Sequence, residues 1–191
     1  MPNTDINQSN TIAHRFGTVA IVGRPNVGKS SLLNAMLGEH LSITSAKPQT
    51  TRHRIMGVVT QPMFQIAFAD TPGFQTKHTG AMNSVMNRTV TQSITGVEAA
   101  VLVLESGRFT LADKTVVDLI PPDLPLIVAI NKTDLHENIH ELLPFVEKLA
   151  IELPNAVFVP VSAKRNTNTQ ALLDAIAKHL PEDLHSLTRT R

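Results

Sequence analysis

An eight-residue segment near the amino terminus of this 191-residue chain constrains its fold more than any other feature. Residues 23–30 read GRPNVGKS and fit the pattern G-x-x-x-x-G-K-[ST]. A β-branched run at residues 18–22 predicts a strand before the segment, and apolar residues at helical spacing predict a helix at residues 29–38 after it. Between a strand and a helix, backbone N–H groups and the positive end of the helix dipole point at one anion. The segment therefore predicts a phosphate-binding loop.

The residue types of this loop suit that chemistry. Glycine at Gly23 and Gly28 lets the main chain approach a phosphate that a Cβ would hold away. The Lys29 ammonium would neutralise the β- and γ-phosphates of a nucleotide, and the Ser30 hydroxyl would ligate magnesium. The alternative is a tight glycine-rich turn with a surface lysine. We expect nucleotide contacts from the whole segment: Gly23, Arg24, Pro25, Asn26, Val27, Gly28, Lys29 and Ser30.

The rest of the chain alternates between strands and helices. Strands are predicted at residues 18–22, 55–60, 63–69, 100–104, 126–130 and 156–159, and helices at 29–38, 82–94, 111–120, 144–152 and 168–180. Capping boxes are expected at the start of two helices, from Thr110 with Asp113 and from Thr167 with Gln170. The turn at residues 61–62 makes one strand pair antiparallel, whereas helical crossovers make the other pairs parallel. We therefore expect an α/β protein with the P-loop NTPase fold: a mostly parallel six-stranded sheet with one antiparallel edge strand and helices on both faces.

Length and composition set further limits. We expect one domain with short appendages: a flexible tail at residues 1–16, a nucleotide-binding domain at 17–181 and a linker at 182–191. Cysteine is absent, which excludes disulfides and thiolate zinc sites. No apolar run approaches the roughly 18 residues of a membrane-spanning helix, so we expect a soluble protein. The formal net charge of +1 gives no strong bulk attraction to nucleic acid or anionic membranes.

Two segments suggest the parts that respond to a γ-phosphate. Residues 39–54 form a long polar connection, which is typical of a functional or moving loop. The segment Asp70-Thr71-Pro72-Gly73 follows a predicted strand, where ligands of parallel sheets bind. There Asp70 would hold magnesium through water, and the Gly73 N–H would meet the γ-phosphate.

Two further strand ends predict which base is bound. The segment Asn131-Lys132-Thr133-Asp134 ends in a carboxylate that can accept both N1–H and N2–H of guanine. Adenine offers an acceptor at N1 and nothing at C2, so it would leave Asp134 unpaired and be rejected. After the last strand, backbone N–H groups of Ser162 and Ala163 could bond guanine O6.

Taken in this order, the motifs resemble those of the TRAFAC-class GTPases, and within that class the TrmE-Era-EngA-like group and its Era family. The likeness rests on GRPNVGKS (23–30), SITSAKPQTTRHRI (42–55), DTPGF (70–74), NKTD (131–134) and VSAK (161–164), and spans residues 16–181. It implies GTP hydrolysis with Mg²⁺ and a switch threonine at Thr51, with Thr50 as the alternative. The implied metal ligands are Ser30, Thr51 and Asp70. Beyond the phosphate loop, the implied nucleotide contacts are Asp70, Thr71, Pro72, Gly73, Asn131, Lys132, Asp134, Ser162, Ala163 and Lys164.

The resemblance also bears on catalysis. Phe74 stands where Ras-like enzymes have the glutamine that positions water, and Gln75 comes one residue late. Asn26 matches the residue that ligates K⁺ in potassium-activated relatives, which implies slow turnover that is faster in K⁺ than in Na⁺. The alternative for Asn26 is a turn residue with no chemical duty. The implied catalytic set is Lys29, Thr51, Asp70, Gly73 and Asn26, and the alternative function is a guanine-nucleotide-binding scaffold that does not hydrolyse GTP.

Members of the Era family carry a second domain, a KH module that binds 16S ribosomal RNA through a G-x-x-G loop. The resemblance implies a role in assembly of the small (30S) ribosomal subunit, as a cytoplasmic monomer with peripheral association at the inner face of the cell membrane. The last glycine here is Gly107, so we expect the KH module to be missing and RNA binding not to carry over. A small basic surface from Arg15, Arg52, His53 and Arg54 is an alternative to an ordinary solvated loop.

Residues 136–140 suggest an alternative function of a different class, that of a zinc hydrolase. His136, Glu137 and His140 fit H-E-x-x-H, the signature of zinc hydrolases. That mechanism needs both histidines on one face of a helix, with the glutamate as base. The segment is polar and Pro144 follows closely, so a surface loop is the expected interpretation.

Overall fold

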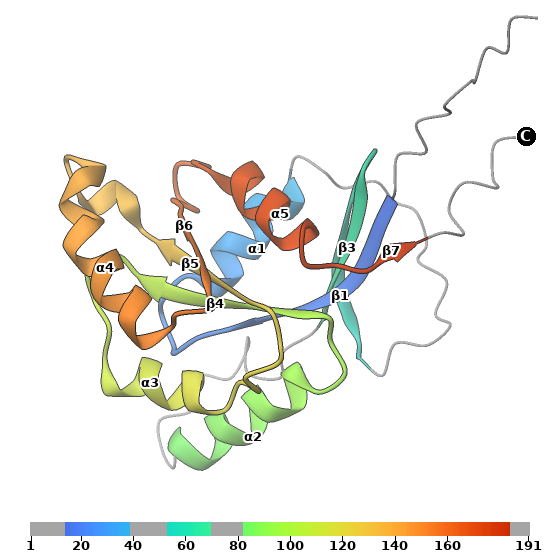
Figure 1. Cartoon of the computed structure of the whole chain (residues 1–191), viewed down its shortest axis with the longest axis horizontal. Coiled ribbons are helices and arrows are strands. Elements are labelled where there is room, and N and C mark those ends of the chain that lie inside the picture. Colours follow the sequence, from blue (N-terminus) through green and yellow to red (C-terminus); the bar gives the residue numbers. More distant parts are fainter. Residues whose placement is uncertain (1–13, 39–52, 70–81, 184–191) are drawn as a thin grey trace, which may run out of the picture.

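A central sheet organises the computed structural model, which describes residues 14–38, 53–69 and 82–183 (Figure 1). Its strands are β1 (His14–Val22), β2 (Ile55–Gln61), β3 (Phe64–Ala69), β4 (Ala99–Glu105), β5 (Leu126–Asn131), β6 (Val157–Pro160) and β7 (Glu182–Asp183). The main order is β2-β3-β1-β4-β5-β6, and β7 pairs with β1 alone. Only the β2–β3 and β1–β7 pairs are antiparallel among the described strands. The predicted α/β sheet with its antiparallel edge strand is confirmed.

Helices cover both faces of this sheet. Helices α1 (Lys29–Gly38) and α5 (Thr169–Ala177) lie on one face, whereas α2 (Met82–Ile94), α3 (Leu111–Asp118) and α4 (Leu143–Glu152) lie on the other (Figure 1). Strand β1 shows why two cores form. Val19 and Ile21 pack into the core under α1 and α5, while Ala20 and Val22 pack into the core under α2, α3 and α4. Because successive side chains of a strand point to opposite faces, an unbroken apolar strand supplies both cores.

The structure confirms one of the two predicted helix capping boxes and contradicts the other. The capping box at α3 is confirmed: the Thr110 hydroxyl accepts from the Asp113 N–H, and the Thr110 N–H donates to the Asp113 carboxylate. The expected box from Thr167 and Gln170 is wrong. The Thr167 backbone instead pairs with Ser162 in an isolated bridge, and the Gln170 side chain bonds Gln61 on β2. Contacts between distant segments therefore outweigh the local capping pattern.

The sheet extends beyond both ends of the expected domain 17–181. Strand β1 begins at His14, within the expected tail, and β7 lies within the expected linker. Arg15 holds the two ends together. Its guanidinium donates to the carbonyl oxygens of Lys178 at 2.8 Å and Leu180 at 3.1 Å, and it pairs with Glu182 at 3.1 Å. Arg15 therefore binds the last carbonyl groups after α5, a favourable place for a cation.

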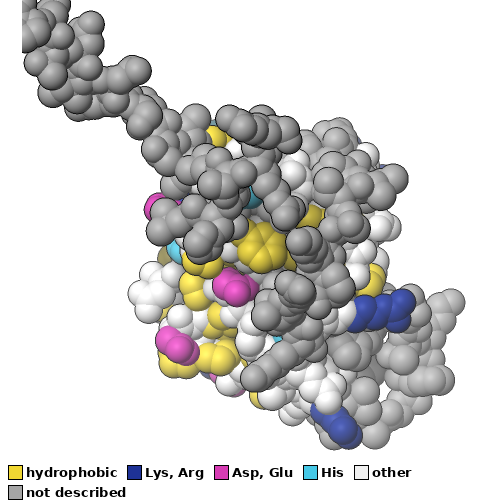
Figure 2. Space-filling model, turned by 90° about the vertical axis from the view of Figure 1, so that its right-hand side faces the viewer, with side chains coloured by type: hydrophobic (Ala, Val, Ile, Leu, Met, Phe, Trp, Pro, Cys, Tyr) yellow, Lys and Arg dark blue, Asp and Glu magenta, His cyan; other side chains and the backbone are white. Residues whose placement is uncertain are grey.

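The described side chains on the face that carries β1 and β7 form no basic patch. Among the described side chains of that face, the Lys and Arg side chains in Figure 2 lie apart and acidic groups lie elsewhere on it. Arg52 falls outside the described residues, and Arg15 is engaged with α5 and Glu182.

Within the described ranges, no helix combines the length and apolar character that crossing a membrane requires.

Candidate nucleotide-binding site

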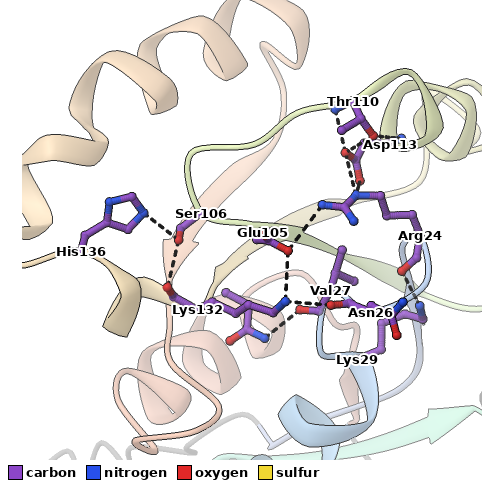
Figure 3. Close-up of polar contacts among 11 residues, drawn as sticks. Arg24, Asn26, Val27, Lys29, Glu105, Ser106, Thr110, Asp113, Lys132 and His136 are labelled. Carbon is purple, nitrogen blue, oxygen red and sulfur yellow. Dashed lines mark hydrogen bonds and ion pairs between the residues drawn. The ribbon is translucent and has the colours of Figure 1, made fainter.

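The predicted phosphate loop joins β1 to α1 at the carboxyl edge of the sheet, beside the ends of β4 and β5 (Figure 3). Gly23 and Gly28 have φ values of 153° and 96°. A Cβ on Gly23 would lie 2.7 Å from the Val103 carbonyl oxygen, and a Cβ on Gly28 would collide with the Asn131 amide nitrogen. Asn26 is also left-handed at φ 66°, a conformation that Asn tolerates better than most residues. The glycines are thus required by the neighbouring strands as well as by a phosphate.

Lys29, the first residue of α1, lies across this loop. Its ammonium donates to the carbonyl oxygens of Gly23 and Arg24, at 2.8 Å each. Burial, and secondarily the Arg24 charge, lowers the pKa of Lys29 to about 8. The charged ammonium therefore still predominates at neutral pH. A bound anion would offset the cost of burying this charge.

Asn131, the last residue of β5, connects the phosphate loop to the segment after β6. Its amide nitrogen donates to the Val27 carbonyl oxygen at 2.9 Å, and its amide oxygen accepts from the Ala163 N–H at 3.0 Å. The residue is only 2% exposed. One buried amide with satisfied partners on both sides therefore sets the distance between two loops that the sequence separates widely.

Asp134 occupies the predicted base-reading position. Its carboxylate accepts from the Ser162 hydroxyl at 2.6 Å, and that hydroxyl in turn accepts from the Arg165 N–H at 3.1 Å. The Ser162 hydrogen bond, more than the nearby Lys164 and Arg165 charges, holds the pKa of Asp134 below its usual value. At neutral pH the group is thus an ionised acceptor, as pairing with two N–H groups requires.

Lys132 bridges the two halves of the site. Its ammonium donates to the Asn26 carbonyl oxygen at 2.8 Å and to Glu105 Oε2 at 3.0 Å (Figure 3). This hydrogen bond from Lys132 is the main reason that the pKa of Glu105 is lowered. The Lys132 carbonyl oxygen accepts from the Ser106 hydroxyl at 2.9 Å.

The Arg24 side chain turns away from the phosphate loop toward α3. Its Nε lies 3.1 Å from Asp113 Oδ1, and its Nη2 lies 3.6 Å from Glu105 Oε2. Asp113 has no exposed surface. Arg24 is predicted to contact a nucleotide, and in this structure its side chain points at Asp113 and Glu105.

Three residues of this network were missed at the sequence level. Glu105 and Ser106 received no role, and Asp113 was assigned only to helix capping. A signal existed for the first two, because they are the polar residues that directly follow the apolar strand 100–104 at the binding edge.

Several predicted site residues lie outside the described ranges. These are Thr50, Thr51, Asp70, Thr71, Pro72 and Gly73, together with Phe74 and Gln75. Their roles in catalysis and metal binding stay predictions. Of the predicted metal ligands, Ser30 lies within the described residues, exposed in the first turn of α1 next to Lys29.

The zinc-hydrolase alternative is wrong, because residues 136–140 form no α-helix. Residues Thr133–Leu135 and Ile139–Leu142 are short 3₁₀ turns, and His136 between them is extended. The His136 ring bonds the Ser106 hydroxyl at 2.9 Å and lies 3.7 Å from Glu141. Across the described part of the chain, no group of three or more His, Cys, Asp or Glu residues is placed to hold a metal ion.

Comparison with known proteins agrees with this geometry. Residues 18–132, more than half of the chain, match the family described as 50S ribosome-binding GTPase. The chain belongs to this GTPase family. The match covers the phosphate loop, Glu105 and Asn131, and it ends at Lys132, before Asp134 and the Ser162–Ala163 segment.

Within the GTPase family, the chain is similar to the Era proteins in sequence and in structure. GTPase Era of Bordetella avium is 50% identical over 170 residues, which are 89% of this chain and 57% of that protein. A crystal structure of Era with MgGDPNP and nucleotides 1506–1542 of 16S ribosomal RNA superposes with a TM-score of 0.72 at 36% identity, covering 89% of this chain and 58% of that one. A point variant of Aquifex aeolicus Era bound to GDP.AlF4⁻ gives a TM-score of 0.70 at 35% identity, covering 88% and 58%. The resemblance to Era is thus confirmed, and the chain spans less than two thirds of the length of these relatives.

Proposed function

We propose that this domain binds GTP and GDP and hydrolyses GTP to GDP and phosphate. One observation carries the proposal: the Asn131 amide joins the phosphate loop to Ala163, while Ser162 holds the Asp134 carboxylate. A base-reading acid and a phosphate loop are thus kept at a set separation, as recognition of one nucleotide requires. Guanine can pair both N–H groups with Asp134, whereas adenine would leave the carboxylate unpaired.

Different residues of the site bind the phosphates and the magnesium ion. The N–H groups at the start of α1 and the Lys29 ammonium bind the phosphates. Without a ligand this ammonium donates to two loop carbonyl oxygens, and pairing it with an anion instead would offset the free-energy cost of burying its charge. The Ser30 hydroxyl supplies an oxygen ligand of the type that Mg²⁺ prefers, with Asp70 and Thr51 as the further ligands that we propose. When bound, Mg²⁺ neutralises charge that develops on the phosphates.

For hydrolysis we propose Lys29, Thr51, Asp70, Gly73 and Asn26 as the catalytic set. Asn26 would ligate K⁺, which would supply the positive charge that an arginine finger supplies elsewhere. Its exposure and left-handed backbone at the loop tip support this role. Turnover is therefore expected to be slow and faster in K⁺ than in Na⁺.

The cellular role that we propose is assembly of the small ribosomal subunit, with 16S ribosomal RNA and the 30S subunit as partners. Identity of about half to GTPase Era proteins and likeness to Era bound to 16S ribosomal RNA support it. We place the protein in the cytoplasm as a monomer that associates peripherally with the inner face of the cell membrane.

Titration calorimetry with Mg²⁺ tests the binding proposal. The protein should bind GDP and discriminate strongly against ADP. Asp134→Ala should lose about 10²-fold or more of GDP affinity and most of this preference, because the guanine N–H groups lose their acceptor. Equal binding of both nucleotides by the parent and by Asp134→Ala would refute the proposal.

Single-turnover hydrolysis with excess protein tests the enzyme against a non-hydrolysing scaffold. GTP and GDP separated by chromatography give the rate, measured in K⁺ and in Na⁺. Tight GTP binding without conversion would support the scaffold. Equal rates in the two salts would remove the role of K⁺.

A further inference from the structure

Glu105, the last residue of β4, and Ser106, the next residue, hold Lys132 from both ends, and neither belongs to a motif of the nucleotide site. We propose that Glu105 and Ser106 are positioning residues for the base, acting through Lys132 to set the preference for guanine nucleotides. This inference rests on the proposed function, since it concerns the same pocket.

Glu105 holds the ammonium end. Its Oε2 lies 3.0 Å from Lys132 Nζ, and the same ammonium donates to the Asn26 carbonyl oxygen at 2.8 Å. The methylene stem of Lys132 therefore runs from the base-reading segment to the phosphate loop. The Lys132 and Glu105 side chains are 34% and 21% exposed, so water screens this pair less than a fully solvated one.

Ser106 holds the backbone end. Its hydroxyl donates to the Lys132 carbonyl oxygen at 2.9 Å, and its N–H donates to the Asn131 carbonyl oxygen at 2.8 Å. Lys132 needs this support because its φ of 64° is left-handed, which costs a non-glycine residue about 1 kcal/mol or more. The His136 ring lies 2.9 Å from the same hydroxyl and orients it. The strained residue is thus kept in the conformation that carries its stem across the pocket.

A second route could connect Glu105 to the nucleotide. Arg24 Nη2 lies 3.6 Å from Glu105, and Arg24 belongs to the phosphate loop, where it is paired with the buried Asp113 (Figure 3). If Glu105 acted through Arg24, its loss would disturb the phosphate site itself. On the Lys132 route the phosphate loop should be undisturbed, because Lys132 can keep its bond to the Asn26 carbonyl oxygen when Glu105 is changed. Pyrophosphate, which engages the phosphate loop without a base, therefore separates the two routes.

Calorimetry with GDP and with pyrophosphate separates the routes. Glu105→Gln should weaken GDP binding about fivefold to tenfold and leave pyrophosphate binding unchanged, because it removes one charge-assisted hydrogen bond to Lys132. In a Lys132→Met background the same substitution should have no further effect on GDP, which is the signature of action through Lys132. Ser106→Ala should weaken GDP binding about threefold and again spare pyrophosphate. Glu152→Gln, the same change on an exposed residue at the end of α4, is the matched control.

The outcomes are distinguishable. Equal losses for GDP and pyrophosphate, or additive effects of Glu105→Gln and Lys132→Met, would overturn the inference. So would unchanged GDP affinity in both Glu105→Gln and Ser106→Ala when the parent binds GDP. Absence of GDP binding by the folded parent would instead refute the proposed function. Thermal unfolding of each variant checks the fold, and Ser106→Ala keeps the inference testable if Glu105→Gln does not fold.

Discussion

Raising the pH above neutrality should weaken GDP binding through Lys29. Burial lowers the pKa of this lysine from 10.5 to about 8 in the protein without nucleotide. Bound phosphates favour the ammonium, so the nucleotide complex holds the proton to higher pH. By linkage, affinity is complete below the pKa of the free protein and falls as the pH rises through it.

The size of the effect follows from that pKa. A group with a pKa near 8 is about nine-tenths protonated at pH 7 and about one-tenth protonated at pH 9, so the Kd for GDP should rise about tenfold, or about 1.4 kcal/mol. The chain has neither Cys nor Tyr, so no thiol or phenol titrates in this range. Protein folding itself should not fail over the same interval. Between the folded and unfolded pKa values of Lys29 the unfolded chain binds more protons, so this lysine makes the free protein more stable as the pH rises.

The assay is calorimetric titration of GDP with Mg²⁺ at pH 7, 8 and 9, in buffers of different ionisation heat, so that proton uptake is measured directly. Lys29→Arg is the control, because a guanidinium keeps its charge throughout this range. If deprotonation of guanine N1–H also makes the Kd for GDP depend on pH, that dependence persists in Lys29→Arg. The pH dependence that is due to Lys29 disappears in this variant. A parent Kd that is constant between pH 7 and 9, or an equal slope in Lys29→Arg, would refute the reasoning.

Further predictions concern the frame of the pocket. Asn131→Ala should lower the free energy of unfolding in urea by about 2 kcal/mol or more, because it leaves the Val27 carbonyl and the Ala163 N–H unpaired; an unchanged midpoint would count against it. Gly28→Ala should abolish measurable GDP binding in calorimetry, since its φ of 96° is strained for alanine and its Cβ meets Asn131; affinity within threefold of the parent would contradict this. Asp113→Ala should lower the free energy of unfolding by about 3 kcal/mol, because it removes a fully buried partner of Arg24, and a circular-dichroism urea titration measures this. On the acid side, the preference for GDP over ADP should persist between pH 7 and 5, since the pKa of Asp134 is lowered and its carboxylate stays ionised, while titration of the terminal phosphate affects both nucleotides alike; a loss of this preference in calorimetry would contradict the prediction.

The sequence predicted the elements well where apolar periodicity was strong. The run Ala99–Glu105 is apolar almost throughout, as a strand buried on both faces must be, and it forms β4. The predicted capping box of α5 was wrong and strand β7 was missed for a common reason. Thr167 pairs with Ser162, and β7 pairs with β1 from the other end of the chain, so both depend on partners that local patterns do not contain.

By itself, the sequence determined which residue types the proposed pocket contains: two glycines that permit a tight loop, a lysine and a serine that we propose for phosphate and metal, and an acid that we propose for guanine. These features are local, because a motif of a few residues after a strand specifies its own backbone and donor set. Only the tertiary structure decided how they are held. Asn131 contacts Val27, Glu105 contacts Lys132, and both pairs exist because the order of strands brings these ends to one edge. Side-chain bonds across such an edge depend on sheet order and register, which residue spacing along the chain does not specify.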